Sequence, residues 1–165
     1  LLSHMFLHGG WMHIIGNMLY LWIFGNNIED RLGHVRFVLF YLLCGAAAAL
    51  AQSLVNTHSE VPMIGASGAI AGVLGAYLVL FPRAHVLVLV PLGFFTQLLK
   101  LPAVLVLGFW FVLQLFEGGL MARGEEGGVA HWAHVGGFVA GIVLIFLLRP
   151  RPSAAGPWQR RGPWG

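Results

Sequence analysis

Ser67 and His134 could together carry out nucleophilic catalysis in this apolar sequence. A serine hydroxyl is a weak nucleophile until a neighbouring base takes its proton, and histidine is well suited to that task near neutral pH. Ser67 follows Gly65 and Ala66 but is not part of a G-x-S-x-G elbow, because Ala69 takes the place of the last glycine. Small residues of this kind also serve simple helix packing. The chemistry that the pair predicts is a Ser–His dyad.

His13 and Asn17 could supply hydrogen bonds to the same reaction. They are four residues apart, so on a helix they share one face. Paired donors aimed at a developing oxyanion stabilise a tetrahedral intermediate, and so do the free N–H groups at a helix N-terminus such as the one expected at Ser67. The alternative is hydrogen bonding between helices that only holds a bundle together.

A third member of a catalytic triad is hard to find in the sequence. Asp30 is the only aspartate, and it lies on the opposite side of the membrane in the topology derived below. Glu117 lies toward the outer end of an apolar stretch and could orient His134, but an ordinary interfacial acid would occupy the same position. The residues therefore favour a dyad.

Metal binding is the competing interpretation of the histidines. His131 and His134 are three residues apart, and His8 and His13 would complete an outer cluster of four. No carboxylate or cysteine is found at matching spacing, so a metal site ranks below the dyad. No cofactor and no metal are expected.

These residues must be positioned by membrane-spanning helices. The 165 residues are 58% hydrophobic and only 9% charged, whereas a soluble domain carries about 25% charged residues. The apolar stretches that could span or fill a membrane bundle are 11–28, 35–55, 67–81, 99–121 and 129–148. Pro82, Pro91 and Gly93 interrupt the connector 82–98, which we expect to be interfacial, with a short helix or strand possible. The single Cys44 fits plain helix packing.

The basic residues indicate how the helices are oriented. Lys and Arg collect in cytoplasmic loops, and here all of them except Arg123 follow the first, third or fifth stretch. Arg123 follows the fourth stretch but is offset by Glu125 and Glu126. In this topology the catalytic candidates share the outer side of the membrane. We expect a membrane domain at 1–148, followed by a cytoplasmic, disordered tail at 149–165. Such a topology predicts a further helix before Leu1. Scattered basic residues and a net charge of +3 do not indicate nucleic-acid binding.

Two glycine pairs could bring the dyad together. Gly68 and Gly72 follow Ser67, and Gly137 and Gly141 follow His134, each pair four residues apart. Such G-x-x-x-G surfaces allow close helix crossing in membranes. A crossing of the third and fifth stretches at these glycines would place Ser67 and His134 within reach of each other.

Taken in order, these motifs resemble those of the rhomboid intramembrane proteases. The resemblance rests on the runs 8–17 (HGGWMHIIGN), 65–68 (GASG) and 134–137 (HVGG) with Gly141, and on 29–33 (EDRLG) after the first stretch. It covers nearly everything from His4 to Leu148, and the ordered set is specific to the family. It implies an all-α, polytopic membrane helix bundle with five spans of a six-helix core present in this chain.

The resemblance also implies roles for the residues. Ser67 would be the nucleophile and His134 the general base, while His13, Asn17 and the backbone N–H of Ser67 would form the oxyanion hole. The substrate would be a transmembrane helix cleaved near its outer end, and a bacterial cytoplasmic membrane would be the location. The family's first helix and its long first loop with a Trp-Arg motif are not in this chain. Many relatives have an aromatic residue one turn after the serine, where this chain has Ala71. What orients His134 is therefore left open.

Two other functions remain open at this point. A rhomboid-like protein can bind membrane clients without cutting them, although such proteins usually lack the serine or histidine. A metal- or haem-binding membrane protein, or a purely structural bundle, would be a different class. Oligomeric state and substrate identity do not follow from the sequence.

Overall fold

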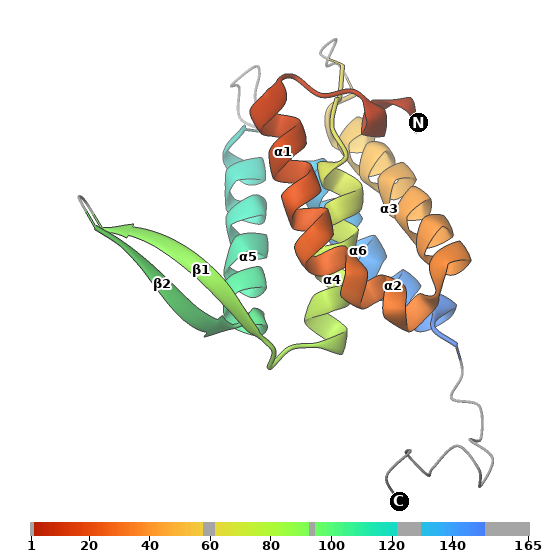
Figure 1. The fold of residues 1–165 in the computed structure, drawn as a ribbon. Coiled ribbons are helices and arrows are strands. Elements are labelled where there is room, and N and C mark those ends of the chain that lie inside the picture. Colours follow the sequence, from red (N-terminus) through yellow and green to blue (C-terminus); the bar gives the residue numbers. More distant parts are fainter. Residues whose placement is uncertain (1, 58–61, 93–94, 122–129, 151–165) are drawn as a thin grey trace, which may run out of the picture.

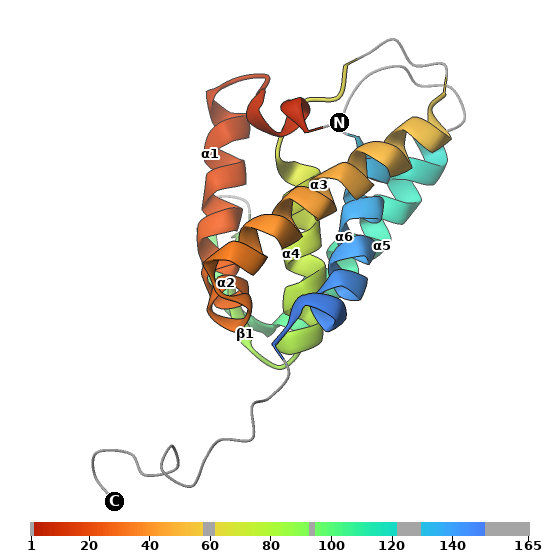
Figure 2. The ribbon, with the colours of Figure 1, turned by 90° about the vertical axis from the view of Figure 1, so that its right-hand side faces the viewer.

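The central element of the fold is α4 (Ser67–Leu80), which the other helices surround in both views (Figures 1 and 2). The structure is a computed structural model that describes residues 2–57, 62–92, 95–121 and 130–150. Every residue from Gly68 to Tyr77 is buried. The 14 residues of α4 span about 21 Å, less than the hydrocarbon thickness of about 30 Å. One end of so short a helix must lie inside the bundle, and Figure 1 shows the segment 62–66 descending to the start of α4.

The first predicted stretch forms one helical rod with an irregular middle. It comprises α1 (Trp11–Tyr20), a π-helical segment (Leu21–Gly25) and α2 (Asn26–Leu32). A short 3₁₀ helix (Ser3–Phe6) precedes the rod. Gly33 ends it with φ +78°, a left-handed conformation that favours glycine. The chain then turns directly into α3 (His34–Val55), and the Glu29 and His34 side chains pair across this turn.

The remaining helices are α5 (Ala103–Met121) and α6 (His131–Leu148). Within the described part of the chain, the three helices long and apolar enough to cross a membrane are α3, most of α5, and α6. Together with the rod and the short apolar α4, they form a polytopic helix bundle. The predicted all-α membrane bundle is confirmed at this level.

The connector between α4 and α5 forms a β-hairpin. β1 (His85–Leu92) and β2 (Phe95–Pro102) pair antiparallel from His85↔Pro102 to Leu92↔Phe95. Valines and leucines alternate along β1, and β-branched residues favour extended backbone. The helix α5, which corresponds to the predicted apolar stretch 99–121, therefore begins at Ala103. The predicted start at Leu99 is wrong by one turn. Figure 1 shows the hairpin leaning away from the bundle beside α5.

Glycines allow α4 and α6 to pack backbone against backbone. A Cβ built on Gly137 would overlap the carbonyl oxygen of Gly68, and one built on Gly141 would overlap that of Gly72. Since no side chain separates these surfaces, the two backbones reach a distance that larger residues would forbid. The structure thus brings the two G-x-x-x-G pairs together.

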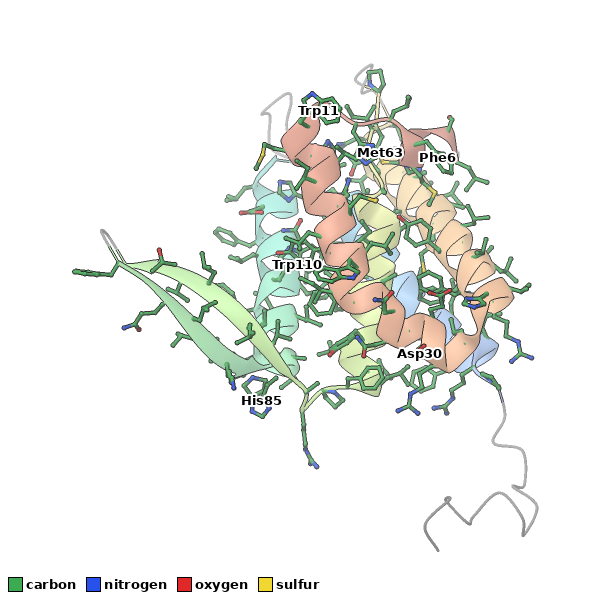
Figure 3. All side chains as sticks on the ribbon, viewed as in Figure 1. Phe6, Trp11, Asp30, Met63, His85 and Trp110 are labelled. Atoms are coloured by element: carbon green, nitrogen blue, oxygen red, sulfur yellow. The ribbon has the colours of Figure 1, made fainter. Side chains whose placement is uncertain are left out.

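The outer surface of the bundle is apolar, and the basic residues of its described part gather at one end. Large side chains such as Val35, Phe109 and Leu147 are more than half exposed, as expected for a surface that faces lipid. Figure 3 shows Asp30 and His85 at one end of the molecule and Trp11 and Met63 at the other. The predicted disordered tail falls almost entirely on 151–165, outside the described residues, as does the loop 122–129.

Candidate active site

Ser67 is the first residue of α4 and lies where the chain turns into the bundle. The turn is made at Gly65, whose φ of +113° favours glycine. The backbone N–H of Gly65 donates to the carbonyl oxygen of His4 (2.9 Å), which ties the turn to the N-terminal segment. N–H groups in the first turn of a helix have no partner within that helix. The hydroxyl group of Ser67 therefore lies beside backbone N–H groups that have no partner within α4.

His134 lies one turn into α6 and faces Ser67. Its Nε2 is 2.8 Å from Ser67 Oγ, a hydrogen-bond distance. The imidazole is buried, with 9% of the residue exposed. The glycine contact between α4 and α6 explains this closeness, because Gly68 and Gly137 follow the two polar residues by one and three positions. The structure thus places the two predicted dyad residues in direct contact.

Two residues of α5 hold the ring of His134, and sequence reasoning missed both. Gln114 Oε1 lies 2.7 Å from His134 Nδ1, and the Trp110 ring lies 5.7 Å from the imidazole at an angle of 38°. They are four residues apart and so share one face of α5. A polar residue inside an apolar span was the available signal. Trp110 thus lies against the imidazole of His134, whereas the residue one turn after Ser67 is the small Ala71.

Glu117, which we had considered for orienting His134, contacts a different histidine. Its Oε2 is 3.3 Å from Nδ1 of His131. His131 Nδ1 is also 3.1 Å from Gln114 Oε1, so the two histidines of α6 share one amide oxygen. Glu117 lies almost one turn further along α5 than Gln114. Of these two side chains, Gln114 is the one that contacts His134.

His13 approaches the same region from α1. The backbone N–H of Gly9 donates to its Nδ1 (3.3 Å). In a neutral imidazole the other nitrogen, Nε2, then carries the proton and is a donor. Nε2 lies against the backbone of Gly65, since a Cβ built on that glycine would contact it at 2.6 Å. The N–H of His13 is thus placed beside the turn that leads into Ser67.

Asn17 lies one turn further along the same face of α1. It is buried, and its Nδ2 makes no hydrogen bond within the described part of the chain. A buried donor without a partner is unfavourable by about 1–3 kcal/mol. Such a group is expected to bind an acceptor that enters the site. His8 packs edge-on against His13 with 5.2 Å between ring centroids, and its own Nε2 also lacks a partner there.

The dyad and the two donors line one cavity of about 320 Å³ between α1, α4, α5 and α6. Figure 3 shows Trp110, one of the lining residues, midway along the bundle. Apart from the dyad and the two donors, the lining is largely apolar. The lining residues are Met12, His13, Gly16, Asn17, Tyr20, Ser67, Ile70, Ala71, Leu74, Trp110 and His134.

The histidines do not assemble as a metal site in the described residues. No three His, Cys, Asp or Glu side chains in that part of the chain lie close enough to hold an ion. His131 and His134 each direct Nδ1 to Gln114 instead. The arrangement consists of a serine hydroxyl, an imidazole with a partner on its far nitrogen, and two donors beside them, which are the group types that nucleophilic catalysis requires.

Comparison with known proteins identifies the family. The Rhomboid domain family matches residues 1–151, nearly the whole chain. The chain belongs to the rhomboid family. This confirms the resemblance read from the ordered motifs, and it makes the bundle the polytopic helical fold of that family. This rhomboid is accordingly an integral membrane protein.

Similar curated proteins include both plant and bacterial rhomboids. RHOMBOID-like protein 5 of Arabidopsis thaliana is 33% identical over 161 residues, 93% of this chain and 45% of that protein. Rhomboid protease GlpG of Haemophilus influenzae is 32% identical over 146 residues, 88% of this chain and 67% of that protein. Rhomboid protease GluP of Bacillus subtilis is 33% identical over 144 residues, 87% of this chain and 25% of that protein.

This rhomboid chain spans about half the length of the plant relatives it matches, 45% of RHOMBOID-like protein 5 and 52% of Rhomboid-like protein 11, chloroplastic. The bacterial relatives are named as proteases, and the plant relatives are named only as rhomboid-like. Family membership therefore leaves both a cutting and a non-cutting protein open.

Proposed function

We propose that this rhomboid is an intramembrane serine endopeptidase that hydrolyses a peptide bond in or near transmembrane segments of membrane proteins. The observation that carries the proposal is the 2.8 Å contact between His134 Nε2 and Ser67 Oγ. The contact lies in a cavity lined by apolar residues and donors. The names of the two bacterial relatives add support.

In the proposed reaction Ser67 Oγ attacks the scissile carbonyl carbon while His134 Nε2 takes the hydroxyl proton. The developing oxyanion accepts hydrogen bonds from His13 Nε2, Asn17 Nδ2 and the backbone N–H of Ser67. His134 then gives the proton to the leaving amine, which leaves an acyl-enzyme on Ser67. A water molecule, deprotonated by the same histidine, attacks the acyl carbon. The bond to Ser67 Oγ then breaks, His134 returns the proton to this oxygen, and the new C-terminal carboxyl group leaves. The proposed chemistry uses no metal and no cofactor.

The proposed substrate is a membrane protein whose transmembrane segment unwinds at the cavity. Hydrolysis requires an extended backbone, which unwinding supplies, and water, which must reach the cavity. The basic residues at the opposite end of the bundle favour an orientation with the site on the outer side of a bacterial cytoplasmic membrane. The C-terminal tail then lies in the cytoplasm.

The test is cleavage of a reporter transmembrane protein by the full-length protein in proteoliposomes. We expect wild type to cleave and to react with a fluorophosphonate probe, and Ser67→Ala to do neither. Ser53→Ala is the matched control, since Ser53 is exposed on α3 and should leave both signals unchanged. Equal cleavage by wild type and Ser67→Ala would overturn the assignment. Binding of the reporter without any cleavage by wild type would indicate the non-proteolytic alternative.

A further inference from the structure

Gln114 connects α5 to both histidines at the start of α6. Its side chain is buried, with 7% of the residue exposed. Its Oε1 is 2.7 Å from His134 Nδ1 and 3.1 Å from His131 Nδ1. One amide oxygen has two lone pairs, so it can accept from both rings at once. No step of the proposed reaction yet uses this contact.

The chemistry of an amide oxygen decides which nitrogen of His134 carries the proton. The oxygen can only accept, so the Nδ1 that bonds to it must be protonated. A neutral imidazole protonated at Nδ1 has a free lone pair on Nε2, the atom that lies 2.8 Å from Ser67 Oγ. The opposite tautomer would turn Nε2 into a donor and leave Ser67 without a base.

Glu117 fixes which end of the Gln114 amide faces the histidines. Its carboxylate oxygen lies 3.3 Å from His131 Nδ1, and a carboxylate can only accept. This contact favours the form of His131 that carries a proton on Nδ1, and a protonated nitrogen requires an acceptor from Gln114 as well. An amide turned the other way would direct its NH₂ group at this N–H. The oxygen of Gln114 is thus the end that reaches His134.

We propose that Gln114 is a positioning residue that holds His134 as the tautomer able to deprotonate Ser67. This inference rests on the proposed function. Gln114 occupies the place that a carboxylate takes in a serine-protease triad. An amide supplies the acceptor without placing a second ionised group inside the membrane, where charges are costly. Trp110, one turn away on α5, packs on the ring and restricts its plane.

The test compares Gln114→Met, which removes the acceptor at similar volume, with Gln114→Glu, which keeps it. The control is Gln52→Met, because Gln52 Oε1 also bonds to α6, at the N–H of Ala133 (3.1 Å), without touching His134. The full-length variants are assayed in proteoliposomes for kcat, KM and the pH dependence of reporter cleavage. Nitrogen-15 NMR of labelled histidine reports the His134 tautomer independently of any cleavage.

We expect Gln114→Met to lower kcat by about 10- to 100-fold with little change in KM, because base catalysis contributes on the order of 10²–10⁴. Gln114→Glu should restore much of kcat. The carboxylate introduced by this substitution stabilises the protonated imidazole of His134. As the pH is lowered, the variant should therefore lose activity at a higher pH than wild type does. NMR should show His134 protonated at Nδ1 in wild type and a mixture of tautomers in Gln114→Met.

Three outcomes would overturn the inference. The first is a Gln114→Met variant with the kcat of wild type. The second is equal loss in Gln114→Met and Gln52→Met with no rescue by Gln114→Glu, which would reveal a purely structural contact. The third is wild-type His134 protonated at Nε2. If wild type cleaves nothing but NMR reports the Nδ1–H tautomer, the proposed protease function fails while the contact itself stands.

Discussion

One hydrogen bond to each of two imidazoles determines whether the ring nitrogen that faces the cavity is a donor or an acceptor. Gly9 binds Nδ1 of His13 and leaves its Nε2–H free, and Gln114 binds Nδ1 of His134 and leaves its Nε2 lone pair free. The two imidazoles therefore present opposite functions, a donor and an acceptor, on either side of Ser67. Such a division of labour suits acyl transfer, which needs a base for the nucleophile and donors for the oxyanion.

Asn17 Nδ2, which has no hydrogen-bond partner among the described residues, leads to a kinetic prediction. Asn17→Ala should lower kcat by about 10²–10³-fold, corresponding to the roughly 3 kcal/mol that one oxyanion donor supplies. KM should change little, because the donor acts mainly on charge that develops in the transition state. Reporter cleavage measures both constants.

Asn27→Ala is the control for this prediction, because the hydrogen bond that Asn27 makes within the described residues goes to the carbonyl oxygen of Ile23 on its own helical rod. It should cleave like wild type. A 10-fold rise in KM with unchanged kcat in Asn17→Ala would instead assign Asn17 to ground-state binding.

The polar residues of the site differ in how far the sequence could reveal them. Ser67, His13, Asn17 and His134 could be singled out because polar side chains in apolar spans require a reason to be there. Gln114 could not be paired with His134, since that contact depends on how α5 is rotated about its axis. Neither hydropathy nor the charge pattern specifies this rotation.

At the level of elements, the contact between α4 and α6 sets the geometry of the dyad. The paired glycines predicted this crossing because their four-residue spacing repeats on both helices. The hairpin 85–102 was not predicted in this form, since a short apolar run between prolines fits a helix or a strand equally well. Its register depends on cross-strand pairs that only the fold reveals.

Gly137→Ala should damage stability and activity together. The added Cβ overlaps the carbonyl oxygen of Gly68, so the helices must separate, and overpacking of this kind costs about 1–3 kcal/mol. The same separation lengthens the contact between His134 and Ser67. Thermal unfolding in detergent and reporter cleavage measure the two effects.

Gly108→Ala on α5 is the control for Gly137→Ala, because a Cβ there meets nothing within 4 Å. It should be neutral or slightly stabilising, since alanine favours helix by up to about 1 kcal/mol over glycine. Wild-type stability and activity in Gly137→Ala would contradict close backbone packing as the basis of the site.

For the molecule as a whole, the basic residues of the described part and the candidate site lie at opposite ends of the bundle. The basic residues in the described part of the chain lie near the helix ends far from Ser67 or near the base of the hairpin. They are Arg31, Arg36, Arg83, Lys100 and Arg149. Ser67, His13 and His134 lie toward the other end, near the starts of α4, α1 and α6. This separation was predictable from the sequence because consecutive spans alternate in direction.

The separation predicts which loops are accessible from each side of the membrane. Thr57→Cys, after α3, should react with a membrane-impermeant maleimide added to intact cells, whereas Arg83→Cys, after α4, should react only after permeabilisation. Both positions are exposed. The native Cys44 is fully buried, so the unmodified protein is a built-in control that should label only after denaturation. Labelling of Arg83→Cys in intact cells, with Thr57→Cys protected, would reverse the topology and place the site on the cytoplasmic side. In that case the substrates would have to present their cleavage sites to the cytoplasm.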